Sequence, residues 1–265
     1  MVSITLYVTG GFSHTIDFPE NWNELTVAEL EIVAAAQINH GNSEPVSKAV
    51  VLTSIIEQRA KQNGIELPST WKESLDFEAA ATQGFDAINF LYTTNNRTIN
   101  PYPTLTVGGK RMIGPADDFD SITCGEMEDC EVFFMQMVQE PSINKLAHIA
   151  AILWRPRNAP YKAKQCESRI PAFEALPLPQ LFAIYMWYTG CRNNLPLYFP
   201  KVYGGGSNTS TTPDLTAFTK CIHAGAGAKN GLRENIRAML AKEFLFDMNL
   251  EAEQAEEMRK KYERQ

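Results

Sequence analysis

Two segments of the chain carry the same helix-start pattern, and they constrain its fold more than any other feature. Each has a threonine three residues before a glutamate, Thr26 with Glu29 and Thr123 with Glu126, and an amphipathic run follows. In such a capping box the threonine hydroxyl accepts the glutamate N–H, and the glutamate carboxylate accepts the threonine N–H. The sequence therefore predicts that an amphipathic helix begins directly after each threonine.

A β-hairpin is predicted ahead of each of these helices. Residues 4–18 contain two runs of β-branched and aromatic residues, separated by Gly10-Gly11. Residues 104–113 contain two similar runs around Gly108-Gly109, a two-residue turn of the kind that joins antiparallel strands. Because both hairpins are small and the remaining pattern is helical, the predicted fold class is α+β and predominantly α-helical.

Apolar residues at helical spacing predict helix for most of the remaining chain. The segment 178–190 is apolar on nearly all sides, which is typical of a central helix, and Gly190 is predicted to end it. Residues 156–177 are interrupted by prolines and are predicted to be irregular. The predicted helices are about 27–38, 45–62, a short element with Trp71 and Leu75, 83–93, 124–138, 142–154, 178–190, 214–223, 231–247 and a charged terminal helix over 249–265.

One domain boundary is predicted near 95–103, a loop rich in asparagine, threonine and proline. The expected parts are 1–95, with a hairpin and helices, 104–248, a helical domain that the second hairpin opens, and the charged terminal helix 249–265. Two domains are compatible with a length of 265 residues. Both halves place a capping box after a hairpin, but these devices are common, so duplication is the less favoured explanation.

Composition argues against several classes of protein. The chain has 44% hydrophobic and 21% charged residues, which is typical of a globular fold, and its net charge of −7 argues against duplex binding. Five cysteines without a CxxC pair predict buried thiols in a reducing cytosol. We expect neither a signal peptide nor a membrane span, because no basic start precedes a long apolar run anywhere near 18 residues.

No pattern in the sequence predicts a catalytic, cofactor or metal site. The four histidines are far apart, and neither a phosphate-binding glycine motif nor a serine nucleophile elbow is present. Cys124 lies at a predicted helix N-terminus, which favours a thiolate, but a structural thiol is the preferred interpretation. An enzyme site around Cys124, or around Asp117, Asp118, Asp120 and Glu126, is the less favoured alternative.

Two charged clusters are the candidate partner-binding sites. Acidic residues concentrate over 117–131, where a solvated acidic face is the preferred interpretation and a docking face for a basic partner the sharper one. Basic residues concentrate over 155–169 around an aromatic side chain, a mixture that single-stranded nucleic acid favours, although the acidic chain makes nucleic acid an unlikely partner. The candidate partner-binding residues are Asp117, Asp118, Asp120, Glu128, Trp154, Arg155, Arg157 and Tyr161.

Residues 114–156 carry a family resemblance. They read Gly-Pro-Ala-Asp-Asp-Phe, then Ile-Thr-Cys-Gly-Glu-Met-Glu-Asp, and finally Ile-Asn-Lys-Leu-Ala-His-Ile-Ala-Ala-Ile-Leu-Trp-Arg-Pro. A threonine-x-glycine-glutamate helix start, followed by a helix that ends in alanine-x-leucine-aromatic-arginine-proline, resembles tail-assembly proteins of bacteriophages and prophages, including tail assembly chaperone-like proteins. Its motifs are helix caps, a core helix and a proline stop, so the resemblance carries over no catalytic residue.

The resemblance implies a non-enzymatic protein of phage-type tail assembly. Such a protein would chaperone or dock another tail protein, for example the tape-measure chain, in the host cytoplasm. A structural virion component, such as a connector or a baseplate piece, is the alternative, and an enzyme with an acidic or cysteine site is the least favoured. No cofactor and no membrane partner are implied, and the oligomeric state stays open.

Overall fold

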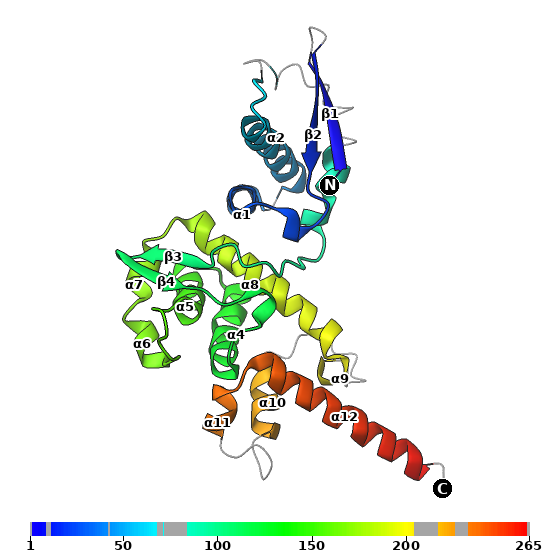
Figure 1. Ribbon diagram of the computed structural model, residues 1–265, viewed down its shortest axis with the longest axis vertical. Coiled ribbons are helices and arrows are strands. Elements are labelled where there is room, and N and C mark those ends of the chain that lie inside the picture. The colour runs from blue at the N-terminus through cyan, green and yellow to red at the C-terminus, as the bar shows by residue number, and fades with distance from the viewer. Residues whose placement is uncertain are drawn as a thin grey trace. The chain divides into compact units, whose positions relative to one another are not determined.

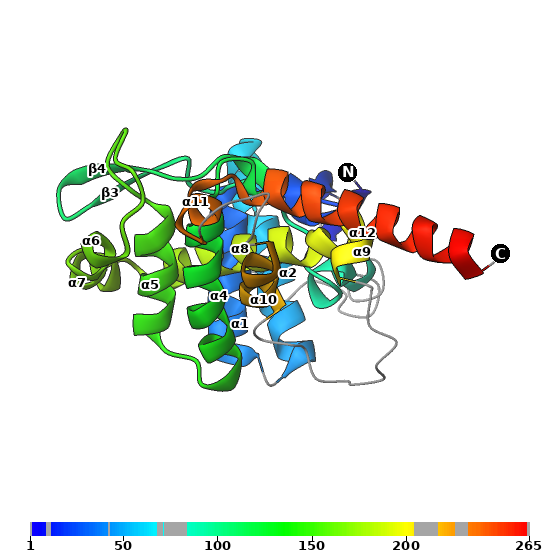
Figure 2. The ribbon, with the colours of Figure 1, turned by 90° about the horizontal axis from the view of Figure 1, so that it is seen from below.

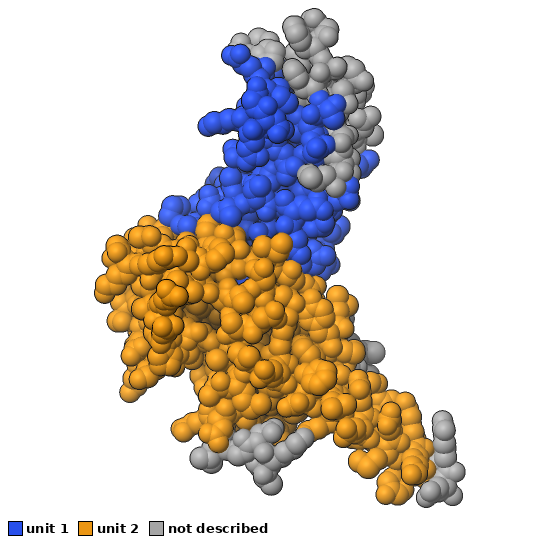
Figure 3. Space-filling model, in the orientation of Figure 1, with its two compact units in different colours: residues 1–97, 177–190 blue, residues 98–176, 191–265 orange. Residues whose placement is uncertain are grey.

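The computed structural model describes residues 2–8, 12–41, 43–67, 71, 84–203, 217–225 and 233–263. They form helices and two antiparallel sheets of two strands each, so the predicted α+β, mostly helical fold class is confirmed (Figure 1). The chain divides into two compact units, and both are discontinuous in sequence (Figure 3). Unit 1 comprises residues 1–97 and 177–190, and unit 2 comprises residues 98–176 and 191–265.

Unit 1 begins with the first predicted hairpin. Strands β1 (Val2–Val8) and β2 (Phe12–Phe18) pair with Ile4 opposite Ile16. The helices that follow are η1 (Trp22–Glu24), α1 (Val27–His40), α2 (Glu44–Gln62) and η2 (Asn89–Tyr92). Part of the predicted helix 83–93 is therefore a 3-10 turn, and most of the predicted short element around Trp71 and Leu75 lies outside the described residues.

The capping box of α1 is confirmed, and it is part of a buried ion pair. The Glu29 N–H donates to Thr26 Oγ1 at 3.3 Å, and the Thr26 N–H donates to Glu29 Oε2 at 2.9 Å. Glu29 is fully buried, and Arg59 of α2 donates to both of its carboxylate oxygens. Arg59 also donates to the Asp17 carbonyl at 2.6 Å, so one guanidinium ties α2 to the start of α1 and to β2.

Helix α8 (Leu178–Tyr198) does not end at Gly190, which corrects the prediction of a C-cap there. Its first residues belong to unit 1, where the Asn95 side chain donates to the Met186 carbonyl at 2.7 Å. A Cβ atom on Gly190 would lie 2.5 Å from the backbone nitrogen of Arg97 and 2.8 Å from Asn95 Oδ1. Gly190 therefore allows a segment of backbone to approach the helix closely, and it does not terminate the helix.

Unit 2 contains the second hairpin and a group of packed helices. Helix α5 lies between α4 and the pair α6–α7, while α10, α11 and α12 contact α4 (Figure 2). Helices α6 and α7 correct the prediction that residues 156–177 are irregular throughout. The elements are β3 (Thr104–Val107), β4 (Lys110–Ile113), η3 (Asp117–Phe119), α4 (Cys124–Gln139), α5 (Ile143–Leu153), α6 (Ala163–Glu167), α7 (Ile170–Glu174), α9 (Pro200–Tyr203), α10 (Ala217–Gly225), α11 (Arg233–Ala238) and α12 (Ala241–Glu263).

The predicted helix 231–247 is two helices with a break between α11 and α12. At the break the Cys124 N–H donates to the Met239 carbonyl at 2.9 Å, and the Ala241 N–H donates to the Ile122 carbonyl at 2.8 Å. Backbone groups that would continue the helix are thus paired with the segment before α4. Helix α12 then runs through residue 249 without interruption, so the predicted charged terminal helix is the second half of α12.

The length and the apolar character of the helices decide whether any of them could cross a membrane. None of those in the described part of the chain combines the length and the apolar character that crossing a lipid bilayer requires.

Candidate functional site

Unit 2 contains an open cleft of about 630 Å³ at the N-terminal end of α4. This volume falls within the range of about 300–1,000 Å³ that is typical of ligand-binding sites. Its sides are α4, helix α11 and the loop between α5 and α6. The cleft is lined by Thr123, Gly125, Arg155, Asn158, Ala159, Pro160, Tyr161, Ala163, Glu234, Arg237 and Ala238.

The capping box of α4 forms one side of the cleft and is confirmed as predicted. The Thr123 N–H donates to Glu126 Oε2 at 2.9 Å, and the Glu126 N–H donates to Thr123 Oγ1 at 3.3 Å. Glu126 is buried, and Arg155 Nη2 lies 2.7 Å from its Oε1 atom. Burial raises the pKa of Glu126, and Arg155 opposes that rise. The plan repeats that of α1, where the buried capping glutamate also pairs with an arginine.

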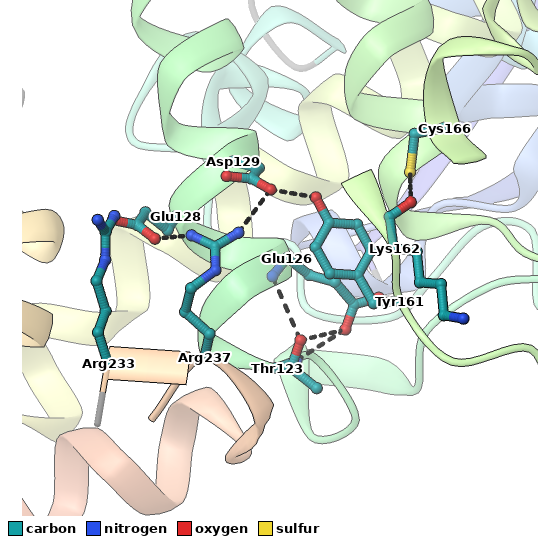
Figure 4. A network of polar contacts seen from close by, with 9 residues as sticks. All are labelled: Thr123, Glu126, Glu128, Asp129, Tyr161, Lys162, Cys166, Arg233 and Arg237. Carbon is teal, nitrogen blue, oxygen red and sulfur yellow. Dashed lines mark hydrogen bonds and ion pairs between the residues drawn. The ribbon is translucent and has the colours of Figure 1, made fainter. Parts of the chain in front are cut away.

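Two arginines of α11 neutralise the next two acidic residues of α4 (Figure 4). Arg233 Nη2 lies 2.7 Å from Glu128 Oε1, and Arg237 contacts Glu128 Oε2 as well as Asp129 Oδ2, the latter at 2.8 Å. Glu128 is only 4% exposed, so it requires such partners to stay ionised. This part of the acidic run is therefore an internal ion-pair network, which corrects the prediction of a solvated acidic face.

Tyr161 connects the loop after α5 to the same network. Its hydroxyl donates to Asp129 Oδ2, and its side chain lines both the cleft and an adjacent cavity of about 270 Å³. Burial and the neighbouring Asp129 carboxylate raise the pKa of Tyr161 far above its usual value, so it remains a phenol at neutral pH. Burial also raises the pKa of Asp129, while Tyr161 and Arg233 oppose the rise.

The aspartates predicted before α4 lie at a different place in unit 2. Lys242 of α12 lies 2.6 Å from Asp118 Oδ2 and 2.8 Å from Asp120 Oδ1. The Asn100 N–H donates to Asp117 Oδ1 at 2.8 Å. Asp118 and Asp120 already share a cation from their own chain, and all three are absent from the lining of the cleft. The structure thus does not bring them together with the other predicted residues.

The remaining predicted residues divide into core and cleft. Trp154 is fully buried, and its Nε1 donates to the Tyr102 carbonyl at 2.7 Å, so it is a core residue. Arg155 lines the cleft, and Arg157 is exposed in the turn that leads to Asn158. The turn is tight, since Asn158 has a positive φ of 60°.

Sequence reasoning missed Arg233 and Arg237, the two cations of α11 that pair with the acidic residues of α4 beside the cleft. They lie more than a hundred residues after Glu128, so no local pattern connects them. The available signal was their spacing of four residues, which places two guanidinium groups on one helix face. A buried carboxylate needs a cation close by to remain ionised, so such a pair of arginines is a candidate partner for it.

The four buried thiols of unit 2, those of Cys124, Cys130, Cys166 and Cys191, are protonated at neutral pH. Cys124 is fully buried, and burial raises its pKa to about 12, which outweighs its position at a helix N-terminus. Burial also raises the pKa of Cys130, Cys166 and Cys191. Within the described residues, no group of three His, Cys, Asp or Glu side chains is placed to hold a metal ion.

Comparison of the chain with protein-family models, curated proteins and solved structures found no match. The likeness to phage tail-assembly proteins therefore remains a prediction from residues 114–156. The geometry of the cleft is the basis for the functional proposal that follows.

Proposed function

We propose that this chain is a non-enzymatic interaction protein of a phage-type tail assembly system. It binds a segment of another tail protein, such as the tape-measure chain, in the cleft between α4, α11 and the loop after α5. The observation that carries the proposal is an open cleft of about 630 Å³ whose surrounding elements are fixed to one another by buried ion pairs.

The cleft is preorganised for binding. Arg155 fixes the loop after α5 to α4 through Glu126, and Arg237 fixes α11 to α4 through Glu128 and Asp129. Tyr161 adds a hydrogen bond to Asp129. A site that is already ordered loses less conformational entropy when it is occupied, which increases affinity.

The lining of the cleft suits a polypeptide segment. Arg155, Arg237 and Asn158 are hydrogen-bond donors, and the backbone carbonyls of an extended peptide are acceptors. Pro160 and the ring of Tyr161 provide apolar surface for a side chain of that peptide.

The residues that carry the family resemblance support the same location. Thr123 and Gly125 come from the threonine-x-glycine-glutamate helix start, and Arg155 comes from the arginine-proline stop. All three line the cleft. The helix start and the arginine-proline stop of the resembling segment thus both contribute to the site for which we propose a partner.

The test is co-expression with the tape-measure chain of the same phage, followed by gentle co-purification. We expect a complex with the unaltered chain, and we expect Ala159→Trp, which fills the cleft, to abolish it. Ala116→Trp is the matched control, because Ala116 is exposed and lies outside the cleft. Failure to form a complex, or an equal effect of both tryptophans, would contradict the proposal.

A second measurement separates an assembly factor from a structural virion component. Mass spectrometry of purified particles should detect the tape-measure chain and not this chain. Stoichiometric amounts of this chain in finished particles would favour the connector or baseplate alternative.

A further inference from the structure

Helix α12 exposes a line of large apolar side chains. Its first turn is anchored by Ala241, Phe244 and Leu245, which are buried. Beyond that turn the helix lies beside α9, where Lys201 contacts Asn249 and Glu256, and only its last turns extend away from the other helices of unit 2 (Figures 1 and 2). The exposed fractions are 61% for Phe246, 42% for Leu250, 59% for Met258 and 75% for Tyr262.

These four side chains follow a regular spacing along the helix. Phe246 and Leu250 are four residues apart, as are Met258 and Tyr262, and Gln254 lies midway between the two pairs. Residues at this spacing are neighbours on a helix surface, so the four side chains form two apolar pairs along one ridge, with Gln254 between the pairs. Scattered exposed apolar residues need no explanation, but a ridge of this kind marks an interaction surface.

The two ends of the ridge carry opposite charge. Glu243 and Asp247 flank the Phe246 end, where they line a shallow cleft of about 500 Å³ together with Phe199 and Lys242. The Lys242 ammonium is already paired with Asp118 and Asp120, so the carboxylates determine the charge that this end offers a partner. Arg259, Lys260 and Lys261 lie between Met258 and Tyr262 at the other end. Arg259 and Lys260 pair with Glu263 and Glu256 of the same helix, so Lys261 is the cation that the contact uses. Each end of α12 therefore combines large apolar side chains with adjacent charge, and the charge at one end is opposite in sign to the charge at the other.

We propose that the occupant of this ridge is a second copy of the same chain, with the two α12 helices packed antiparallel. Met258 and Tyr262 of one copy then lie against Leu250 and Phe246 of the other, and the symmetry axis passes near Gln254. Because the contact is two-fold symmetric, every interaction occurs twice. Helices that pack along ridges of spacing four cross at about −50°, so Leu250 and Met258 form the centre of the contact and the longer Phe246 and Tyr262 side chains reach across its ends.

Charge complementarity favours this occupant and also sets the register. In the antiparallel arrangement Asp247 of one copy faces Lys261 of the other, at the same distance from Gln254. A parallel arrangement would instead place like charges side by side, which is unfavourable. This surface is separate from the cleft of the proposed tail-protein partner, so either proposal can fail alone.

The test is the oligomeric state of the full chain by light scattering and sedimentation equilibrium. We expect a dimer whose dissociation constant rises about tenfold or more in Asp247→Lys and in Lys261→Glu, since each reversal juxtaposes like charges. The double variant D247K/K261E should restore the dimer, because it exchanges the two charges. A chain that stays monomeric at about 100 µM, a concentration at which even weak complexes are populated, would overturn the proposal.

Matched substitutions test the apolar part of the contact. Phe246→Ser should dissociate the dimer, whereas Val138→Ser on α4, with an exposed fraction of 60% against 61%, should leave it intact. A dimer that neither the charge reversals nor F246S weakens would overturn the proposal. So would a monomer in which F246S removes binding of the tape-measure chain, because the ridge would then belong to that protein. The cleft variant Ala159→Trp should leave the dimer unchanged, which distinguishes the two surfaces.

Discussion

At the scale of single residues, the cleft depends on carboxylates that are buried next to guanidinium groups. Two arginines of α11 contact Glu128, yet they differ in exposure: the side chain of Arg233 is 46% exposed and that of Arg237 is 26% exposed. Solvent screens the more exposed pair, so the two cations contribute unequally to stability. Arg237 also contacts Asp129, and its loss leaves two carboxylates with fewer partners.

We therefore predict that Arg237→Met lowers the free energy of unfolding by about 1–3 kcal/mol, the usual cost of leaving a buried polar group without its partner. Arg233→Met, its matched control on the same carboxylate, should cost less than about 1 kcal/mol. Urea denaturation followed by circular dichroism measures both. Equal losses would show that exposure does not govern the contribution of these pairs.

The buried thiol of Cys124 should make the chain less stable in alkali. Its pKa is about 12 in the folded chain and 9.0 in a solvated cysteine. The folded pKa is raised, so the stabilising contribution is complete below pH 9 and is lost as the pH rises toward 12. Cys124→Ala should reduce the fall in unfolding free energy over this window by up to about 1.4 kcal/mol per pH unit. If the unfolding free energy of the variant has the same pH dependence, the pKa of the Cys124 thiol is not raised in the folded chain.

For Gly190 the informative quantity is the sign of the change in stability when alanine replaces glycine. At an open position in a helix, replacing glycine by alanine stabilises by about 0.5–1 kcal/mol. At Gly190 the added Cβ meets backbone of Arg97, so we expect Gly190→Ala to destabilise by about 1–3 kcal/mol, as overpacking does. Thermal denaturation decides between the two signs, and a stabilised variant would rule out the close approach.

At the scale of elements, local signals in the sequence were sufficient wherever neighbouring residues determine the structure. Both capping boxes and both hairpins are present, because their donors and acceptors lie within a few residues of each other. The break between α11 and α12 could not be predicted, since it depends on hydrogen bonds between residues 122–124 and 239–241. Ion pairs with the distant residues Arg233, Arg237 and Lys242 likewise explain why the acidic run over 117–131 could not be recognised as neutralised.

The two capping boxes should contribute similarly to stability, because they have the same geometry. In each, the threonine hydroxyl accepts a backbone N–H at 3.3 Å, and the glutamate pairs with an arginine. We predict that Thr26→Ala and Thr123→Ala each lower the free energy of unfolding by about 1 kcal/mol. Thr→Ser at the same positions, which keeps the hydroxyl, is the control. A loss in T123S as large as in T123A would mean that the methyl group, and not the cap, is responsible.

At the scale of the whole molecule, the division into compact units does not follow the order of residues along the chain. Residues 177–190 belong to unit 1, although 79 residues assigned to unit 2 separate them from residue 97. A boundary near 95–103 follows from composition, but composition contains no information about a segment that returns to a unit later. The returning segment is held by contacts to its backbone, such as the hydrogen bond that the Asn95 side-chain amide donates to the Met186 carbonyl.

A fragment of residues 1–97 should therefore fold poorly by itself. Without residues 177–190 it lacks the helix that closes over Arg97, a buried side chain whose guanidinium donates to the carbonyls of Trp22 and Leu25. Joining residues 177–190 to this fragment through a flexible glycine–serine linker should restore cooperative unfolding, because loop-closure entropy rises only slowly with linker length. The same linker followed by a scrambled 177–190 segment is the control. A fragment 1–97 that unfolds cooperatively without the added helix, or that gains equally from the scrambled one, would mean that α8 is dispensable for unit 1.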